Sequence, residues 1–192
     1  MRLFLIGALA TLALAGCRST SETAAPVATV AAFDPAEAGY IKKPGKISIH
    51  GHAFWRDDEG GTVNAAGEII RLVPATKYAR ERFAVLYKGQ RSLSIGQIPH
   101  VDVDPQYADY TRTARAESTG RFEFENVAPG AYFVTAQVRY KETEPAGRRR
   151  SAVGGMLGKA LGVGQAGGAM FETVNVTGKE EKPIKLVLTN DR

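Results

Sequence analysis

The sequence has little cysteine and little histidine, which limits the chemistry that the chain can carry. Of its 192 residues one is cysteine, Cys17, and three are histidine. A single cysteine cannot close an intramolecular disulfide, so an apolar core has to stabilise any folded domain. The chain is 44% hydrophobic and 23% charged, which is typical of one globular domain with appendages.

Motifs that mark catalytic sites are also missing from the sequence. It contains no G-x-S-x-G, no H-E-x-x-H and no glycine-rich phosphate loop that opens a helix. The formal net charge of +5 is a modest excess that could favour anionic lipid or glycan surfaces. We therefore expect no enzymatic activity and no cofactor.

The apolar run at the N-terminus is too short to cross a bilayer as a helix. It extends over thirteen residues, Leu3 to Ala15, whereas spanning needs about 20. Arg2 precedes the run and small residues end it before Cys17. This pattern is typical of an export signal, so we expect residues 1–16 to be cleaved.

Leu14-Ala15-Gly16-Cys17 resembles the lipobox of bacterial lipoproteins. The resemblance implies an acylated Cys17 that anchors the protein in the bilayer, and Arg18 in place of aspartate favours the outer membrane, facing the periplasm. The alternative is an ordinary signal peptide with a chance cysteine at its edge. Residues 17–45, rich in Ser, Thr and Ala with three prolines, are predicted to form a flexible tether.

Residues 46–192 are predicted to form one β-rich domain. Lys46 to Trp55 alternates, with Ile47, Ile49 and Trp55 on the apolar face. Thr76 to Tyr87 instead has helical spacing, and Thr76 is its expected N-cap. Further strands are predicted at Glu68 to Val73, Thr111 to Ser118, Arg121 to Glu125, Ala131 to Tyr140, Met170 to Val176 and Pro183 to Leu188.

Residues 120–134, GRFEFENVAPGAYFV, resemble the carboxypeptidase regulatory-like domain, whose recurring pattern is G-x-F-x-F-x-x-V-x-P-G-x-Y. The resemblance implies an all-β, transthyretin/prealbumin-like Greek-key β-sandwich of about seven strands, here with one short helical insertion. Phe122 and Phe124 are expected between the sheets, with Tyr132 packed back against the preceding strand. Transthyretin-like hydrolases typically end in Tyr-Arg-Gly-Ser, which this chain lacks.

Two groups of polar residues could form a metal or small-molecule site. His50 and His52 are two apart on a predicted strand, so both leave the same face. His100, Asp102 and Asp104 also alternate, and all five could bind a divalent ion if the two segments were adjacent. The simpler alternative is a solvated sheet face and loop, which is why we assign no metal.

A glycine-rich, basic loop is predicted over residues 141–169. Its central part, Gly147 to Gly168, begins with three arginines after Gly147 and has glycine at every fourth position from Gly154 to Gly162. Small residues at helical spacing could favour close helix packing or membrane contact. The entropy cost of glycine in a helix favours a hairpin loop instead.

The sequence leaves the partner open. The leading hypothesis is a membrane-anchored, non-catalytic lipoprotein of the cell envelope whose sandwich binds an envelope protein or glycan, through sheet edges or the 141–169 loop. The alternatives are a periplasmic domain that binds a small molecule or metal, and a subunit of a larger envelope assembly. Nucleic acid is disfavoured, because most aromatic residues are expected in the core; Phe33, Tyr40, Tyr107 and Tyr110 are candidates for exposure.

Overall fold

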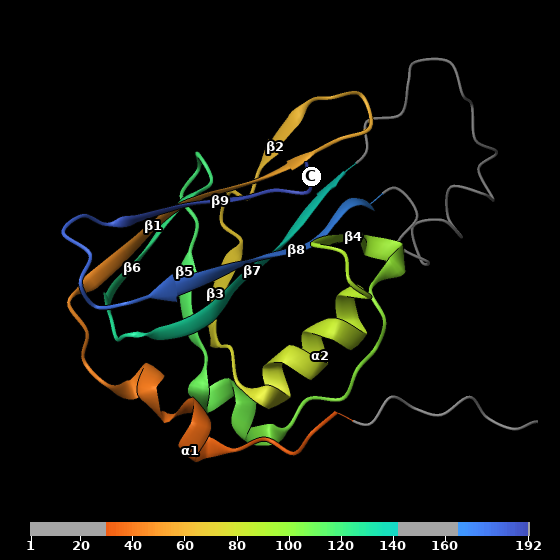
Figure 1. Cartoon of the computed structure of the whole chain (residues 1–192). Coiled ribbons are helices and arrows are strands. Elements are labelled where there is room, and N and C mark those ends of the chain that lie inside the picture. The colour runs from red at the N-terminus through yellow and green to blue at the C-terminus, as the bar shows by residue number, and fades with distance from the viewer. Residues whose placement is uncertain (1–29, 142–164, 192) are drawn as a thin grey trace, which may run out of the picture.

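The computed structural model describes residues 30–141 and 165–191 of the chain. It is a β-sandwich with one helix of three turns and several shorter ones (Figure 1). In chain order the elements are α1 (Pro35–Ala38), the 3-10 helix η1 (Gly39–Lys42), β1 (Ile47–Arg56), β2 (Thr62–Asn64), β3 (Ile69–Pro74), α2 (Lys77–Tyr87), β4 (Ser92–Ser94), the 3-10 helices η2 (Ile95–Gln97) and η3 (Pro105–Tyr110), β5 (Arg112–Arg115), β6 (Arg121–Val127), β7 (Gly130–Lys141), β8 (Gln165–Val176) and β9 (Ile184–Leu188).

The strands form two facing sheets, with α2 as a third layer beneath one of them (Figure 1). In the four-stranded sheet, β1 pairs antiparallel with β2 and β6 and parallel with β9. The five-stranded sheet has the order β4-β8-β7-β3-β5, and all its pairs are antiparallel. The predicted all-β sandwich is therefore confirmed. The described residues form nine strands rather than about seven. The two additional strands are β2 and β4, which have three residues each and were not predicted.

The main core lies between the two sheets and follows the predicted alternation. Ile49 is fully buried on β1, and Tyr132 and Val134 are fully buried on β7. Phe122 and Phe124 are buried on β6, so the expectation that they fill the space between the sheets is confirmed. Burying side chains of this size contributes roughly 1.5–3 kcal/mol each.

A second core lies on the outer face of the five-stranded sheet, under α2. Thr76 is the N-cap as predicted, and its hydroxyl accepts a hydrogen bond from the Ala79 N–H at 3.2 Å. Phe83 stacks on Phe133 of β7, with ring centroids 4.4 Å apart. Because Tyr132 faces the main core and Phe133 the helix, β7 is apolar on both faces.

The C-terminal part of the predicted tether is structured, which corrects the boundary at residue 45. Asp34 caps α1 by accepting a hydrogen bond from the Ala36 N–H at 2.8 Å, and Ala38 and Ile41 are buried. The Tyr40 hydroxyl donates to the Ala131 carbonyl and accepts from the Ala75 N–H at 3.1 Å. These contacts attach the segment to the five-stranded sheet; residues 17–29 lie outside the described part.

Both described ends of the predicted loop 141–169 are strand, which is a second correction. Lys141 ends β7 and pairs with Gln165, the first residue of β8. Gly168 lies within β8, and close packing explains the glycine at this position. A Cβ there would lie 2.0 Å from the Leu93 carbonyl oxygen and 2.4 Å from the Trp55 ring. In the sequence, a glycine that lets two segments of the chain approach closely cannot be distinguished from a glycine in a loop. Residues 142–164 lie outside the described part.

Candidate functional site

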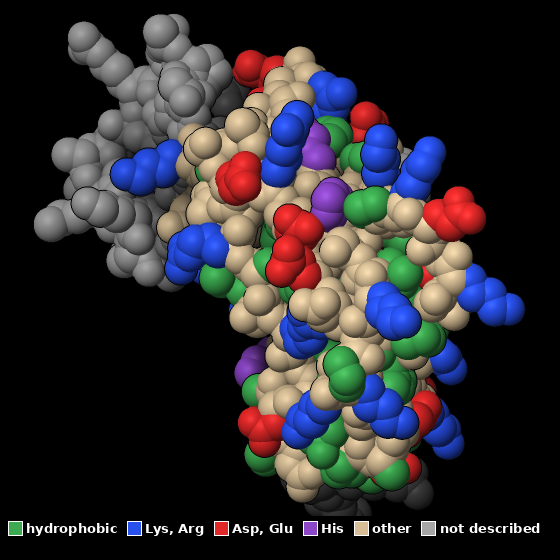
Figure 2. Space-filling view, turned by 90° about the vertical axis from the view of Figure 1, so that its left-hand side faces the viewer, with side chains coloured by type: hydrophobic (Ala, Val, Ile, Leu, Met, Phe, Trp, Pro, Cys, Tyr) green, Lys and Arg blue, Asp and Glu red, His purple; other side chains and the backbone are tan. Residues whose placement is uncertain are grey.

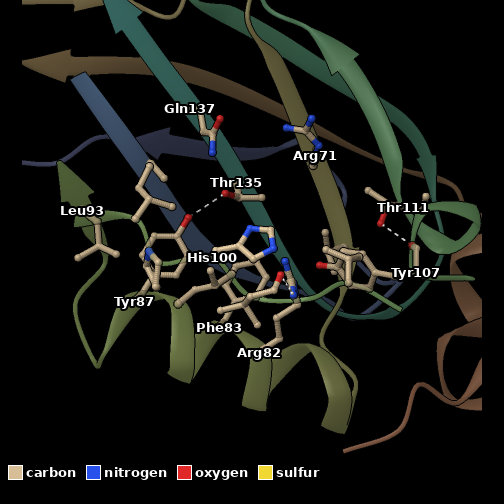
Figure 3. A pocket seen from close by; sticks show the side chains of 18 of the residues that line it. Arg71, Arg82, Phe83, Tyr87, Leu93, His100, Tyr107, Thr111, Thr135 and Gln137 are labelled. Atoms are coloured by element: carbon tan, nitrogen blue, oxygen red, sulfur yellow. Dashed lines mark hydrogen bonds between the residues drawn. The ribbon is translucent and has the colours of Figure 1, made fainter. Parts of the chain in front are cut away.

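A cavity of about 520 Å³ lies on the outer face of the five-stranded sheet, between that face, α2 and the segment from residue 98 to residue 111 (Figure 3). Its size is in the usual range for small-ligand sites, about 300–1,000 Å³. The residues that line it come from five strands, α2 and this segment: Arg71, Val73, Arg82, Phe83, Leu86, Tyr87, Leu93, Ile98, Pro99, His100, Val101, Val103, Tyr107, Ala108, Thr111, Thr113, Thr135, Gln137 and Ala169.

The sheet side of the cavity carries a row of polar side chains. Arg71 on β3 pairs in register with Thr113 on β5 and with Thr135 on β7, so the three side chains leave the same face side by side. Gln137 follows two residues after Thr135 and therefore points the same way. Figure 3 shows Arg71, Thr135 and Gln137 on the sheet side, opposite the aromatic side chains of α2.

The helix side of the cavity is apolar and aromatic. Phe83 and Tyr87 lie one turn apart on α2 and are both 5% exposed. The Tyr87 hydroxyl reaches the sheet and lies 3.1 Å from Oγ1 of Thr135 (Figure 3). Burial raises the pKa of Tyr87 and of Tyr107 above the ordinary tyrosine value, so both phenols stay neutral near pH 7.

The third wall of the cavity is the segment from residue 98 to residue 111, and Arg82 and Tyr78 of α2 bond to its backbone. Nη1 of Arg82 donates to the carbonyls of Val101 and Asp102 at 3.1 and 2.6 Å. The Tyr78 hydroxyl accepts from the Asp104 N–H at 2.9 Å. Because a segment without regular secondary structure needs such partners for its backbone groups, these bonds position the wall against the cavity.

The aromatic residues that the sequence analysis named as candidates for exposure pack on other aromatic rings. The Phe33 ring contacts Tyr78, Tyr107 and Tyr110, with ring centroids 5.4–6.2 Å apart. The Tyr40 ring packs on Tyr132 at 5.2 Å. All four are half-buried and not fully exposed, because the segment before β1, which carries Phe33 and Tyr40, folds back onto the domain.

The structure separates the two halves of the hypothetical metal site. His50 and His52 lie on β1 of the four-stranded sheet, where Nε2 of His50 is 2.6 Å from Glu123 and Nε2 of His52 is 3.3 Å from Asn64. His100 instead lines the cavity on the outer face of the other sheet. Within the described part of the chain, no three of His, Cys, Asp and Glu come close enough to hold a metal ion.

The two aspartates of the second half are used elsewhere. Oδ1 of Asp102 lies 3.5 Å from Nε2 of His100, and both side chains are almost fully exposed. Oδ1 of Asp104 accepts from the Gln106 N–H at 2.9 Å and caps η3. The five residues are therefore not brought together, and only His100 belongs to the cavity.

The face of the molecule in Figure 2 has no concentration of one side-chain type. Lys and Arg side chains are interspersed there with Asp and Glu, hydrophobic side chains are scattered, and two histidine patches lie near each other with a third apart from them. Mixed charge of this kind is ordinary for a solvated surface. The cavity is therefore the more specific feature.

Sequence reasoning missed the cavity because its walls come from distant segments. Two signals pointed to it: an outward-facing phenylalanine, Phe133, beside the inward Tyr132, and the spacing of Phe83 and Tyr87 on α2. Each indicates an apolar surface on the outer side of the sheet. Neither indicates that the polar row with Arg71 lies beside it.

Cys17 and residues 147–164 of the glycine-rich loop lie outside the described residues. Among residues 30–141 and 165–191, no helix combines the length and the apolar character needed to cross a bilayer.

Comparison with known proteins finds similarity in structure. No family model and no curated protein matches the chain. A crystal structure from Pseudomonas aeruginosa, described as a "putative carbohydrate binding protein", superposes with a TM-score of 0.63 at 22% sequence identity. The match covers 84% of this chain and 99% of that one. At this identity the similarity supports the β-sandwich fold.

Proposed function

We propose that the chain is a non-catalytic binding module of the bacterial cell envelope, that lipid on Cys17 anchors it, and that its cavity binds a carbohydrate. The observation that carries the proposal is the two-sided cavity, with Arg71, Thr135 and Gln137 facing an apolar wall. Sugar rings have apolar C–H faces and polar hydroxyl edges, which suit such a site. The name of the similar structure from Pseudomonas aeruginosa, "putative carbohydrate binding protein", is consistent with this class of ligand.

The composition of the cavity supports the non-catalytic part of the proposal. Enzymes that hydrolyse glycosidic bonds generally use a pair of carboxyl groups on either side of the bond. The described residues that line the cavity include neither Asp nor Glu. The groups that are present can donate and accept hydrogen bonds, which is sufficient for binding.

The family relationship and the location are parts of the same proposal. The G-x-F-x-F-x-x-V-x-P-G-x-Y pattern of residues 120–134 supports membership of the carboxypeptidase regulatory-like domains. The lipobox-like sequence that ends at Cys17 supports export and a lipid anchor, and Arg18 in place of aspartate supports the outer membrane, with the domain in the periplasm. A module held there would meet envelope glycans directly.

The test is calorimetric titration of the chain from residue 30 onward with neutral and acidic oligosaccharides, compared with the Gln137→Ala variant. Removing the Gln137 amide is expected to weaken binding about 3- to 10-fold, the usual effect of one hydrogen bond. Asn175→Ala is the matched control, since this exposed amide lies on β8 of the same sheet but outside the cavity. Absence of binding to every oligosaccharide at millimolar concentration would overturn the carbohydrate proposal.

A further inference from the structure

The charges of the cavity are of one sign. Its described lining includes two arginines, Arg71 and Arg82, and no Asp or Glu. His100 also lines it, but its side chain is almost fully exposed and lies 3.5 Å from Oδ1 of Asp102. Asp102, on the outer side of the wall, has a fully exposed side chain, and the Asp104 carboxylate caps η3. The two arginine charges therefore favour an anion inside the cavity.

Arg71 is placed to bind an anion. It lies in the middle of the polar row, its side chain is exposed, and among the described residues it takes part in no ion pair. A guanidinium is a planar fork of donors that is charged at every physiological pH and pairs with carboxylate or phosphate through two bonds. The hydroxyl of Thr113, its register partner on β5, can donate a further hydrogen bond to the anion, whereas the hydroxyl of Thr135 on β7 already donates to the Met170 carbonyl at 2.9 Å.

Arg82 adds a second positive charge, and a protein carboxylate does not neutralise it. Its residue is 9% exposed and its guanidinium donates to two backbone carbonyls of the wall. Among the described residues, Arg82 forms no ion pair either. A charge that is largely removed from water is costly without an opposite charge nearby, so an anionic ligand would stabilise this arrangement.

From these contacts we infer that the ligand is an acidic sugar, whose carboxylate or phosphate binds Arg71 while its ring packs on the apolar wall. This inference rests on the proposed carbohydrate-binding function and names the class of carbohydrate. Arg82 is a positioning residue: it holds the wall through Val101 and Asp102, and its charge adds to the attraction from within the site.

The test compares two ligand pairs whose members differ in the presence of acidic groups: galacturonic acid trisaccharide with its carboxyl-reduced form, and glucose 6-phosphate with glucose. Each charged member is expected to bind at least about 10-fold more tightly than its neutral counterpart, which is the usual effect of a hydrogen bond between charged groups. Its affinity is expected to fall as the salt concentration increases. Preference for one charged member alone identifies the acidic group as carboxylate or as phosphate.

Arg71→Gln is expected to abolish the preference for the charged ligand and to leave the melting temperature nearly unchanged, since the side chain is exposed. Arg80→Gln is the matched control, because Arg80 is an exposed arginine on α2 outside the cavity lining. Equal binding of charged and neutral members overturns the inference and leaves carbohydrate binding intact. A preference that survives in Arg71→Gln, or is lost equally in Arg80→Gln, also overturns it. Binding of neither member of either pair also overturns the inference, and the carbohydrate proposal falls with it only if every other oligosaccharide fails to bind as well.

Discussion

Gly51 and Phe122 are register partners across β1 and β6, and the Phe122 ring occupies the space where a Gly51 side chain would lie. A Cβ built on Gly51 would be 2.0 Å from Cζ of Phe122. The ring itself is 5% exposed and belongs to the main core. Glycine in this strand is therefore required by close packing, because an aromatic ring covers its backbone.

Gly51→Ala is expected to destabilise the domain by about 1–3 kcal/mol, the usual cost of overpacking a core. An alanine free of this clash would instead gain roughly 0.5–1 kcal/mol over glycine in a strand. Urea unfolding of the wild type, Gly51→Ala, Phe122→Leu and the double variant measures both effects. The cost of Gly51→Ala should fall by more than half in the Phe122→Leu background. An unchanged cost would show that the clash with the ring is not its cause.

Thr76→Ala should destabilise the domain by about 1 kcal/mol, because the Ala79 N–H loses the hydroxyl that caps α2. Thr76→Ser retains a capping hydroxyl and is the matched control, expected to cost less than half as much. Chemical denaturation followed by circular dichroism gives both values. Equal losses in the two variants would assign the effect to the buried methyl group of Thr76 instead of the cap.

Tyr132→Phe should destabilise the domain by about 1–2 kcal/mol. The Tyr132 hydroxyl donates to the Ala128 carbonyl at 2.7 Å inside the core, and its loss leaves a buried acceptor without this bond. Tyr107→Phe removes a half-buried phenol whose hydroxyl makes no hydrogen bond found among the described residues, so it should cost less. Thermal unfolding of the two variants side by side tests the difference. A larger effect at Tyr107 would contradict the interpretation.

Stability should depend on pH through Glu180 in the turn before β9. The N–H groups of Thr177 and Gly178 donate to its carboxylate at 2.7 and 2.8 Å. These bonds lower the pKa of Glu180 from 4.5 to about 2. Because the folded-state pKa is depressed, the stabilisation is present above pH 4.5 and is lost as the pH falls toward 2.

Glu180→Gln should therefore lower the melting temperature at pH 7, and the difference from the wild type should shrink between pH 5 and pH 2. Glu181→Gln is the control, since Glu181 is an exposed neighbour whose carboxylate accepts no hydrogen bond from this turn among those found in the described residues. Melting curves across the pH range measure both. A difference that stays constant with pH would contradict the assignment to the carboxylate charge.

Cys17→Ser is expected to move the full chain, expressed in a Gram-negative bacterium, from the membrane fraction to the soluble periplasmic fraction. The reason is that several acyl chains, at about 0.8 kcal/mol per buried methylene, make anchoring effectively permanent, whereas serine carries none. Ser19→Ala is the control, because it changes a nearby residue outside the lipobox-like sequence. Fractionation and mass spectrometry of the mature N-terminus give the readout. A wild-type chain that still begins at Met1 would contradict the anchor.

The predictable part of the fold was the part encoded by local periodicity. The alternation of residues 46–55 and 131–140 placed Ile49 and Tyr132 in the core, and the helical spacing after Thr76 placed α2 with its cap. The pattern around Phe122 and Phe124 located the strand between the sheets. Each of these features depends on side chains within one or two turns or strands, so a short stretch of sequence contains the information.

The boundaries were less predictable, because tertiary contacts set them. The segment with Asp34 and Tyr40 has the composition of a linker, yet the Tyr40 hydroxyl bonds to Ala131 on β7 and to Ala75 just after β3. Gly168 lies in a glycine-rich stretch that is typical of a loop, yet it is part of β8, where a larger residue would clash with Trp55 and Leu93. Composition reports the preferences of an isolated chain, and a few long-range contacts outweigh those preferences.

The sequence by itself determined which residues alternate into strands, where α2 begins, and which faces are apolar. Only the tertiary structure decided that α2 covers the outer face of the five-stranded sheet, and that Arg71 and His100 meet at one cavity while His50 lies on the other sheet. The physical reason is that periodicity specifies that a face must be covered without specifying the element that covers it. That choice depends on the packing of segments far apart in the chain.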